Sequence, residues 1–256
     1  MNLDAAHFSI LWPALIAGFL VALTHVPLGM QVLDRGIVFI DLAVAQVAGV
    51  GVILADSLGW EPEGAAVQVS ALLSALACAL LLTWTDRRWP KVQEAIIGVV
   101  FVLASNVGIL LLAGNPHGGE RLKDLLVGQI LWTDPGHLPL VAFLSAVVFA
   151  AWLVLRERIG RIGFYALFAC AVTLAVQLVG LYLVFATLVV PALSTWRGGP
   201  HRYVKAYGIA LTGYAFGLLL SAVTDLPSGS VIVCCMVLVG MLVGGLSRGE
   251  RDAPAH

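Results

Sequence analysis

Eight stretches of the chain are apolar over the length that crosses a lipid bilayer, and this feature constrains the fold most strongly. They cover residues 10–33, 36–55, 64–84, 92–113, 138–155, 163–183, 203–223 and 229–246. A spanning helix needs about 20 apolar residues, and in lipid it satisfies its own backbone hydrogen bonds. The chain is 60% hydrophobic and only 11% charged. These observations predict an all-α polytopic membrane protein with a single transmembrane domain over residues 1–256.

The basic residues predict how the helices are oriented. Of the 14 Lys and Arg residues, twelve fall on one side of the arrangement, and only Arg121 and Lys123 fall on the other. Because basic loops stay cytoplasmic, we expect the N-terminus outside and the C-terminus in the cytoplasm. That orientation needs an odd number of crossings. The short apolar stretch 184–196 must therefore return across the membrane as a half-helix with irregular backbone, which is typical of transporters.

The sequence contains no motif that indicates an enzyme. The patterns GxxxxGK[ST], HExxH and GxSxG are absent, so any ATP used must bind to another chain. Four cysteines lie in apolar runs without a CxxC pair, which favours small buried side chains over a metal or redox site. The net charge of -1 does not indicate nucleic acid. We expect a transport subunit in contact with membrane lipid, with no bound cofactor and no nucleic-acid partner.

Few polar residues interrupt the apolar runs, and these are the candidates for a transport pathway. Asp41 lies in the stretch 35–56, where a carboxylate costs several kcal/mol unless it meets water or a partner. Asp41 is therefore the candidate metal ligand, and Gln46, His25 and Gln177 are further candidates for the pathway. The alternative is that Asp41 only satisfies the start of its helix. Its position about two turns beyond Arg35 argues against this.

The longest connection, residues 114–137, contains a second kind of candidate. Leu122, Leu125, Leu126 and Ile130 recur at helical spacing there, which predicts a short amphipathic helix in the membrane interface. His117 and His137 flank this helix and are placed to meet an incoming cation. The helix is either a gate at the outer mouth or a passive connector, and histidines in loops are usually only solvated.

Four stretches of the chain, taken in order, resemble one family. They are RGIVFIDLAVAQVAG, then EAIIGVVFVLASNVGILLL with LLVGQIL after it, then VTLAVQLVGLYLVFATLVVPALST, and then DLPSGSVIV. Together they are similar to the permease subunits of zinc/manganese-type ATP-binding-cassette importers. The resemblance implies the type II importer fold, a homodimeric pore in the bacterial inner membrane, cytoplasmic ATPase subunits, and a periplasmic or lipoprotein solute-binding protein.

The chain departs from this family at two places. The family has Asp-x-x-x-His on its second helix, and here Asp41 matches the Asp but Ala45 occupies the His position. The family's acidic cytoplasmic segment before the sixth helix is here basic, with Arg156, Arg158 and Arg161 around Glu157. The resemblance assigns the ATPase contact to these four residues.

The resulting hypothesis is an importer permease for a divalent metal ion or a metal complex that works by alternating access. Two rivals stay open. The same type of importer could carry a non-metal or chelated cargo, which is suggested by Ala45 at the position of the family's His. The chain could instead be an ion-coupled secondary transporter, with Asp41 as its proton or cation site. Co-purification separates these classes, because a secondary transporter needs no ATPase.

Overall fold

A computed structural model of the chain describes residues 5–61, 64–128, 130–155, 160–197, 199 and 201–249, and its regular elements are all helical. Seven helices within these residues are long and apolar enough to span a membrane. They are α1 (Ala5–Arg35), α2 (Ile40–Ser57), α3 (Ala65–Arg88), α4 (Gln93–Leu112), α6 (Leu138–Leu155), α7 (Arg161–Val179) and α9 (Arg202–Thr224). With the 22-residue α10 (Ser228–Gly249) and the short α8 (Leu181–Ser194), they confirm the predicted all-α membrane fold.

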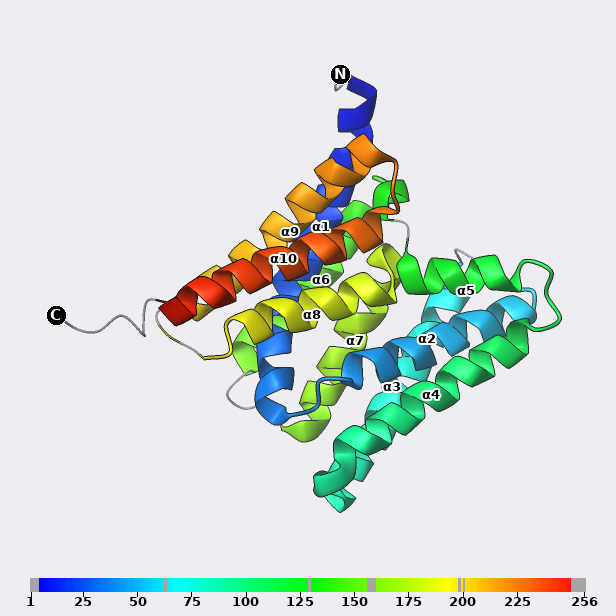
Figure 1. Cartoon of the computed structure of the whole chain (residues 1–256). Coiled ribbons are helices and arrows are strands. Elements are labelled where there is room, and N and C mark those ends of the chain that lie inside the picture. Colours follow the sequence, from blue (N-terminus) through cyan, green and yellow to red (C-terminus); the bar gives the residue numbers. More distant parts are fainter. Residues whose placement is uncertain are drawn as a thin grey trace.

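The helices are arranged around α1, which runs through the middle of the molecule (Figure 1). On one side α2 packs against α3 and α4, and the short α5 (Gly118–Val127) lies beside them. On the other side α8, α9 and α10 pack against one another, and both α8 and α9 contact α1. The two groups are joined by α7, which contacts α3 and α2 as well as α1 and α8. The bridging helix α7 therefore holds the two groups together.

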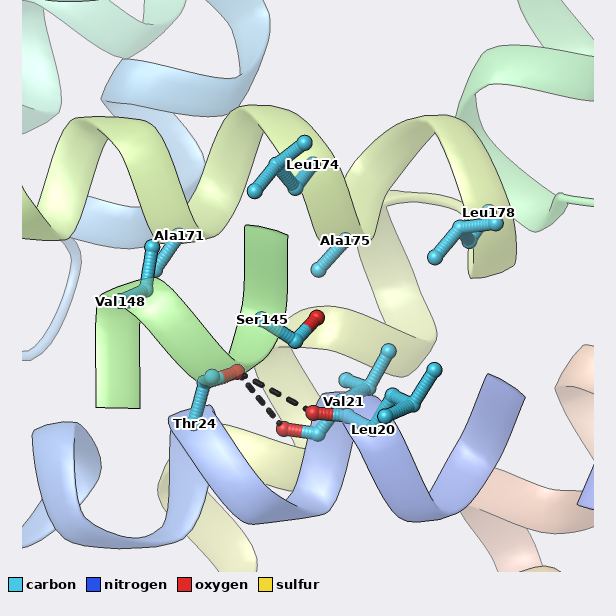
Figure 2. Close-up of a pocket in the computed structure, with 9 residues that line it drawn as sticks. All are labelled: Leu20, Val21, Thr24, Ser145, Val148, Ala171, Leu174, Ala175 and Leu178. Carbon is cyan, nitrogen blue, oxygen red and sulfur yellow. Dashed lines mark hydrogen bonds between the residues drawn. The ribbon is translucent and has the colours of Figure 1, made fainter. Parts of the chain in front are cut away.

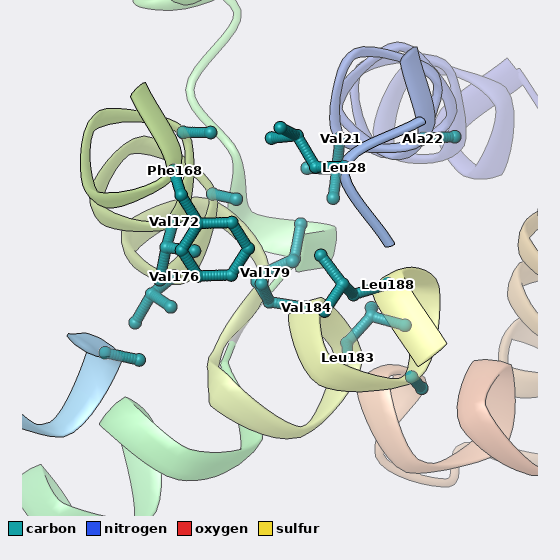
Figure 3. Packing of buried hydrophobic residues seen from close by; sticks show 14 of the residues in the cluster. Val21, Ala22, Leu28, Phe168, Val172, Val176, Val179, Leu183, Val184 and Leu188 are labelled. Atoms are coloured by element: carbon teal, nitrogen blue, oxygen red, sulfur yellow. The ribbon is translucent and has the colours of Figure 1, made fainter. Parts of the chain in front are cut away.

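The interior between α1, α7 and α8 is filled by aliphatic and aromatic side chains. Figure 3 shows Phe168, Val172 and Val176 of α7 facing Leu188 of α8 and Leu28 of α1. Such a core is close-packed and leaves no passage between these three helices. A path for cargo has to lie elsewhere in the molecule.

A proline in α1 is matched by a tyrosine in α9. Pro27 has no N–H group, so it cannot donate the helical hydrogen bond to the carbonyl oxygen of Leu23. The Tyr207 hydroxyl donates to this oxygen instead, at 3.0 Å. Glycines bring the helices together on either side of this bond, because a Cβ at Gly18 would overlap the Tyr214 ring, and one at Gly29 would overlap the Leu188 backbone.

The broken return across the membrane begins earlier than the sequence predicts. The sixth long helix was expected to run to residue 183, but α7 ends at Val179, and α8 begins at Leu181 and has 14 residues. Gly180 makes the break with φ of 80°, a left-handed conformation that favours glycine. The apolar run continues unchanged through Gly180, so hydropathy alone could not locate the break.

The short helix α5 is held to the rest of the chain where the glycine at its C-terminal end meets glycines of two distant segments. α5 ends at Gly128, which has φ of 68° and packs against the backbone of Val179 and Gly180. A Cβ at Gly229, in the first turn of α10, would lie 2.5 Å from the Val127 carbonyl oxygen. We call Gly128, Gly180 and Gly229 the glycine junction. Because α5 ends here, Ile130 falls in a separate 3-10 turn rather than in the predicted amphipathic helix.

One end of the molecule carries arginines that bind to other helices, and we call it the basic end. The Arg35 guanidinium lies 3.9 Å from the centre of the Phe164 ring, which joins the end of α1 to the start of α7. Arg161 at the start of α7 pairs with Asp86 near the end of α3 at 3.5 Å. These contacts place the ends of α1 and α3 and the start of α7 on one side, as the distribution of basic residues predicted.

Candidate functional site

The Asp41 side chain is completely buried, and neither carboxyl oxygen finds a hydrogen-bond partner among the described residues. Its position differs from the sequence interpretation. Residues 36–39 form a turn and α2 begins at Ile40, so Asp41 lies in the first helical turn and not two turns in. A helix N-terminus favours a negative charge there, but Asp41 makes no capping bond. A buried carboxyl with both oxygens unbonded is therefore available to a ligand.

The cap of α2 comes from a residue that the sequence reasoning did not single out. The backbone N–H of Phe39 donates to Oε1 of Glu94 at 3.1 Å, which ties the head of α4 to the start of α2. Glu94 is the first residue of the EAIIGVV stretch quoted above. The sequence did contain a signal for Glu94, because it is an acidic residue at the start of an otherwise apolar helix. Acidic residues are rare in such helices and usually have a bonding partner.

The face of α2 that carries Asp41 continues into a small closed cavity. Ala45 and Gly49 line it, together with Val176 and with Leu125 of α5. Its volume of about 20 Å³ gives room for one water molecule and not for a cargo. The half-buried Gln46 also lines this cavity, so the structure brings Gln46 near the Asp41 face without a direct bond between them. The predicted amphipathic helix thus closes over this space.

A much larger apolar groove lies between α2 and α4. Its volume is about 780 Å³, and its walls include Phe39, Leu42 and Val102. Asn106 also lines it and is exposed, and its amide nitrogen donates to the Val102 carbonyl oxygen of its own helix at 2.8 Å. An exposed amide in so apolar a helix indicates contact with something other than lipid.

His25 lies apart from Asp41. Its imidazole is completely buried, on the face of α1 that Gly18 and Gly29 press against α9 and α8. Nδ1 lies 3.1 Å from the Val21 carbonyl oxygen, which can only accept, so Nδ1 carries the proton in this contact. Nε2 has no partner among the described residues. The structure therefore does not pair His25 with Asp41.

A second cavity, between α1, α6 and α7, does not offer a pathway either. Figure 2 shows Thr24 and Ser145 among the residues that line it, with the Thr24 hydroxyl directed to carbonyl oxygens of its own helix. The volume is about 10 Å³, too small for anything beyond a single water molecule. Among these spaces, only the groove between α2 and α4 is large enough for a cargo.

The remaining predicted residues lie at the surface. Gln177 is exposed and lies in the last turn of α7, which ends at Val179, whereas the sequence had placed it inside a span that continues to residue 183. His117 lies 3.4 Å from Glu120, and His137 lies 3.8 Å from Asp134. Both of these pairs are largely exposed, as expected of solvated loop histidines.

Of the residues predicted to contact an ATPase, Arg156, Glu157 and Arg158 lie outside the described residues. Arg161 is described, and it pairs with Asp86. Among the described residues, no three His, Cys, Asp or Glu side chains gather closely enough to hold a metal ion. Within this part of the chain Asp41 is therefore not one member of a ready-made site of three such side chains.

The long apolar helices around α1, the broken return at Gly180 and the buried Asp41 carboxyl together define a polytopic membrane transport protein. Comparison with known families is consistent with this class. The chain belongs to the ABC 3 transport family, whose sequence profile matches residues 7–159 and 154–244. It is the membrane-spanning permease subunit of an ATP-binding-cassette transporter, and the family resemblance drawn from the sequence is confirmed.

Individual relatives cover nearly the whole chain. The high-affinity zinc uptake system membrane protein ZnuB of Haemophilus influenzae is 23% identical over 95% of this chain and 99% of its own length. The manganese transport system membrane protein MntC of Halalkalibacterium halodurans is 23% identical over 88% of this chain and 83% of its own. The structure of PsaBC from Streptococcus pneumoniae in complex with Fab aligns with a TM-score of 0.72 at 20% identity, covering 93% and 92%. The last comparison supports the fold.

Proposed function

We propose that this permease imports a divalent metal ion, or a small metal complex, into the cytoplasm by alternating access. The observation that carries the proposal is the Asp41 carboxyl, which is buried in the first turn of α2 and has no hydrogen-bond partner among the described residues. Zinc and manganese are the cargoes named for two relatives, ZnuB and MntC. A carboxylate oxygen is a ligand that both metals accept.

The proposed pathway follows the face shared by α2 and α4. Leu42 and Phe39 line the large groove, and Asp41 directly precedes Leu42 in the sequence but is enclosed. A small rotation or shift of the first turn of α2 would bring the Asp41 carboxyl to the groove. Alternating access then consists of exposing this carboxyl first to one side of the membrane and then to the other. Cargo would be attracted electrostatically, since the field of a charge is strong away from bulk water.

We propose that a second copy of the chain packs across the groove between α2 and α4, so that the groove lines a pathway between the two copies. The groove has a volume of about 780 Å³ and is apolar, and the exposed Asn106 amide on its wall is costly against lipid. A two-fold interface would bring each residue near the axis against its own copy. Val102→Cys should then form an inter-subunit disulfide in membranes, whereas Leu80→Cys, on the exposed face of α3, should not. The reverse pattern would place the second copy on a different face.

The other proposed partners follow from the two ends of the molecule. We propose that the ATPase subunits bind at the basic end through Arg156, Glu157, Arg158 and Arg161. A solute-binding protein would deliver cargo at the opposite end, beside α5. The chain would lie in a bacterial inner membrane with its N-terminus outside and its C-terminus in the cytoplasm, as the distribution of basic residues supports.

Substitution of Asp41 tests the proposal directly. Asp41→Asn keeps the size of the side chain and removes its charge, so uptake of Zn²⁺ or Mn²⁺ by cells should be abolished while the protein still folds. If Asp41 only stabilises the helix packing, the amide replaces it with a loss of about 1 kcal/mol and uptake persists. Normal uptake by Asp41→Asn would therefore refute the metal pathway.

One observation favours a second candidate cargo, a chelated metal or a non-metal. Ala45 stands one turn beyond Asp41 and supplies only a methyl group to the small cavity that it lines. A bare cation would obtain one protein ligand here, whereas a chelate brings its own. Competition experiments separate the two, because excess free Mn²⁺ should block uptake of a bare ion and should not block uptake of a preformed chelate.

A further inference from the structure

Gln93, the first residue of α4, has an almost completely buried side chain that forms hydrogen bonds to two neighbouring helices. The side chain is 3% exposed. Its oxygen accepts from the Thr85 hydroxyl of α3 at 2.9 Å. Its nitrogen donates to the Leu82 carbonyl oxygen at 2.9 Å and to the Tyr165 hydroxyl of α7 at 3.4 Å. Buried amides with all partners satisfied hold helices in one arrangement, because an alternative would leave polar groups unbonded.

The next residue, Glu94, reaches in the opposite direction, to α2. Its carboxylate accepts the Phe39 N–H at 3.1 Å. The chain before α2 reads Gly-Ile-Val-Phe, so no Ser, Thr, Asp or Asn stands at the N-cap position, and no local side chain caps the helix. Glu94, on another helix, supplies the missing acceptor. The N–H that it binds belongs to Phe39, two residues before Asp41. The first turn of α2 therefore depends on the position of α4.

The start of α7 completes the connection to the basic end. Arg161 is bound to Asp86 of α3 through its side chain and through the backbone oxygen, at 3.5 and 3.3 Å. Tyr165 lies one turn further along α7 and bonds to Gln93. The segment directly before Arg161 is the one proposed to contact the ATPase. Tyr165, Gln93 and Glu94 thus form a continuous series of contacts from the start of α7 to the Phe39 N–H, two residues before Asp41.

We propose that Gln93 and Glu94 are positioning residues that transmit movement of α7 to the first turn of α2 and so determine when Asp41 meets the cargo. The inference rests on the proposed role of Asp41 and adds the route by which the ATPase controls it. A passive structural role would affect stability and uptake together. A positioning role predicts that ATP hydrolysis continues while less cargo moves per ATP.

Two substitutions at Glu94 test the contact with α2. Glu94→Leu removes the acceptor for the Phe39 N–H, whereas Glu94→Gln keeps an oxygen there. The measurement is Mn²⁺ uptake and ATP hydrolysis by the permease reconstituted with its ATPase in proteoliposomes. Glu94→Leu should lower Mn²⁺ moved per ATP about tenfold, the effect of losing a hydrogen bond to a charged group, and Glu94→Gln should stay within about threefold. Backbone hydrogen exchange at residues 40–43 should rise only in Glu94→Leu.

A substitution in α7 provides an independent test of the proposal if Glu94→Leu does not fold. Tyr165→Phe removes only the bond between α7 and Gln93, and Tyr182→Phe, at an exposed position on α8, is the matched control. Tyr165→Phe should lower Mn²⁺ moved per ATP about threefold, as expected for one neutral hydrogen bond, without lowering ATP hydrolysis. Tyr182→Phe should behave like the wild type.

The outcomes separate this inference from the proposed function. Wild-type coupling in both Glu94→Leu and Tyr165→Phe, with Asp41→Asn inactive, would overturn the link and leave the role of Asp41 intact. Equal losses in Glu94→Leu and Glu94→Gln would also overturn it, because charge and not capping would then matter. Active Asp41→Asn would instead refute the pathway itself.

Discussion

The bond from Tyr207 to the Leu23 carbonyl oxygen shows how one residue offsets the defect made by another. Pro27 frees this oxygen within α1, and a free carbonyl is costly inside a membrane, where no water can replace the partner. The hydroxyl of α9 satisfies it at 3.0 Å. The pair links two residues 184 positions apart, and neither one indicates the other in the sequence.

We expect Tyr207→Phe to destabilise the permease by about 1 kcal/mol, since the Leu23 oxygen is left unbonded. Pro27→Ala restores the N–H that the helix lacks, so Tyr207→Phe should cost much less in that background. Thermal unfolding of the four proteins in detergent measures this difference. Equal costs in both backgrounds would show that the hydroxyl does not serve the proline.

Restoring the family's histidine is a second test at the residue scale. Ala45→His puts an imidazole one turn from Asp41, on the same face of α2, where both could bind one cation. The cavity there holds about 20 Å³, so the single variant should be destabilised by overpacking, by about 1–3 kcal/mol. Ala45→His with Leu125→Ala makes room and should retain Zn²⁺ more tightly than Leu125→Ala alone, as measured by calorimetric titration. Unchanged retention in the double variant would argue against a metal pathway at this face.

At the scale of helices, the glycine junction fixes where α5 lies. Gly128 and Gly180 each have positive φ and pack backbone to backbone, so neither position has room for a Cβ. This contact joins two stretches of the family pattern, LLVGQIL and VTLAVQLVG, and Gly229 adds the DLPSGS stretch. Motifs that are far apart in the sequence therefore meet at one point.

Gly128→Ala should destabilise the permease by about 3 kcal/mol or more, through strain at positive φ and overlap with Val179. Gly119→Ala, also in α5, is the matched control, because a Cβ there meets nothing within 4 Å. The control should be neutral or slightly stabilising, since alanine favours a helix. The yield of folded protein after size-exclusion chromatography measures both. Equal yields would mean that α5 is not held at this junction.

Helix number, helix type and the short return could be predicted from the sequence because each depends on local hydropathy. The positions of Asp41 and Gln177 within their helices were wrong, since they depend on where α2 begins and where α7 ends. Those boundaries are set by the turn at residues 36–39 and by the contact of Gly180 with Gly128. Glu94 was missed for the same reason, because its partner lies on another helix. Local patterns do not contain such tertiary contacts.

For the molecule as a whole, the division into a basic end and an opposite end containing α5 makes the orientation testable. A cysteine at Gly119, which is exposed and has room for a side chain, should react with an impermeant maleimide added outside intact cells. A cysteine at the exposed Lys91 should react only after the cells are opened. Labelling of Lys91→Cys in intact cells would reverse the orientation and the proposed ATPase side with it.

The glycine junction also bears on the order in which the permease is completed during synthesis. Gly128 and Gly180 can meet once α8 has left the ribosome, but Gly229 lies at the start of α10, the last helix among the described residues. Until α10 enters the membrane, the end of α5 at the Val127 carbonyl group lacks the helix that packs against it. Nascent chains that stop before residue 228 should therefore be recognised and degraded as incomplete, although they already contain every residue proposed to handle cargo.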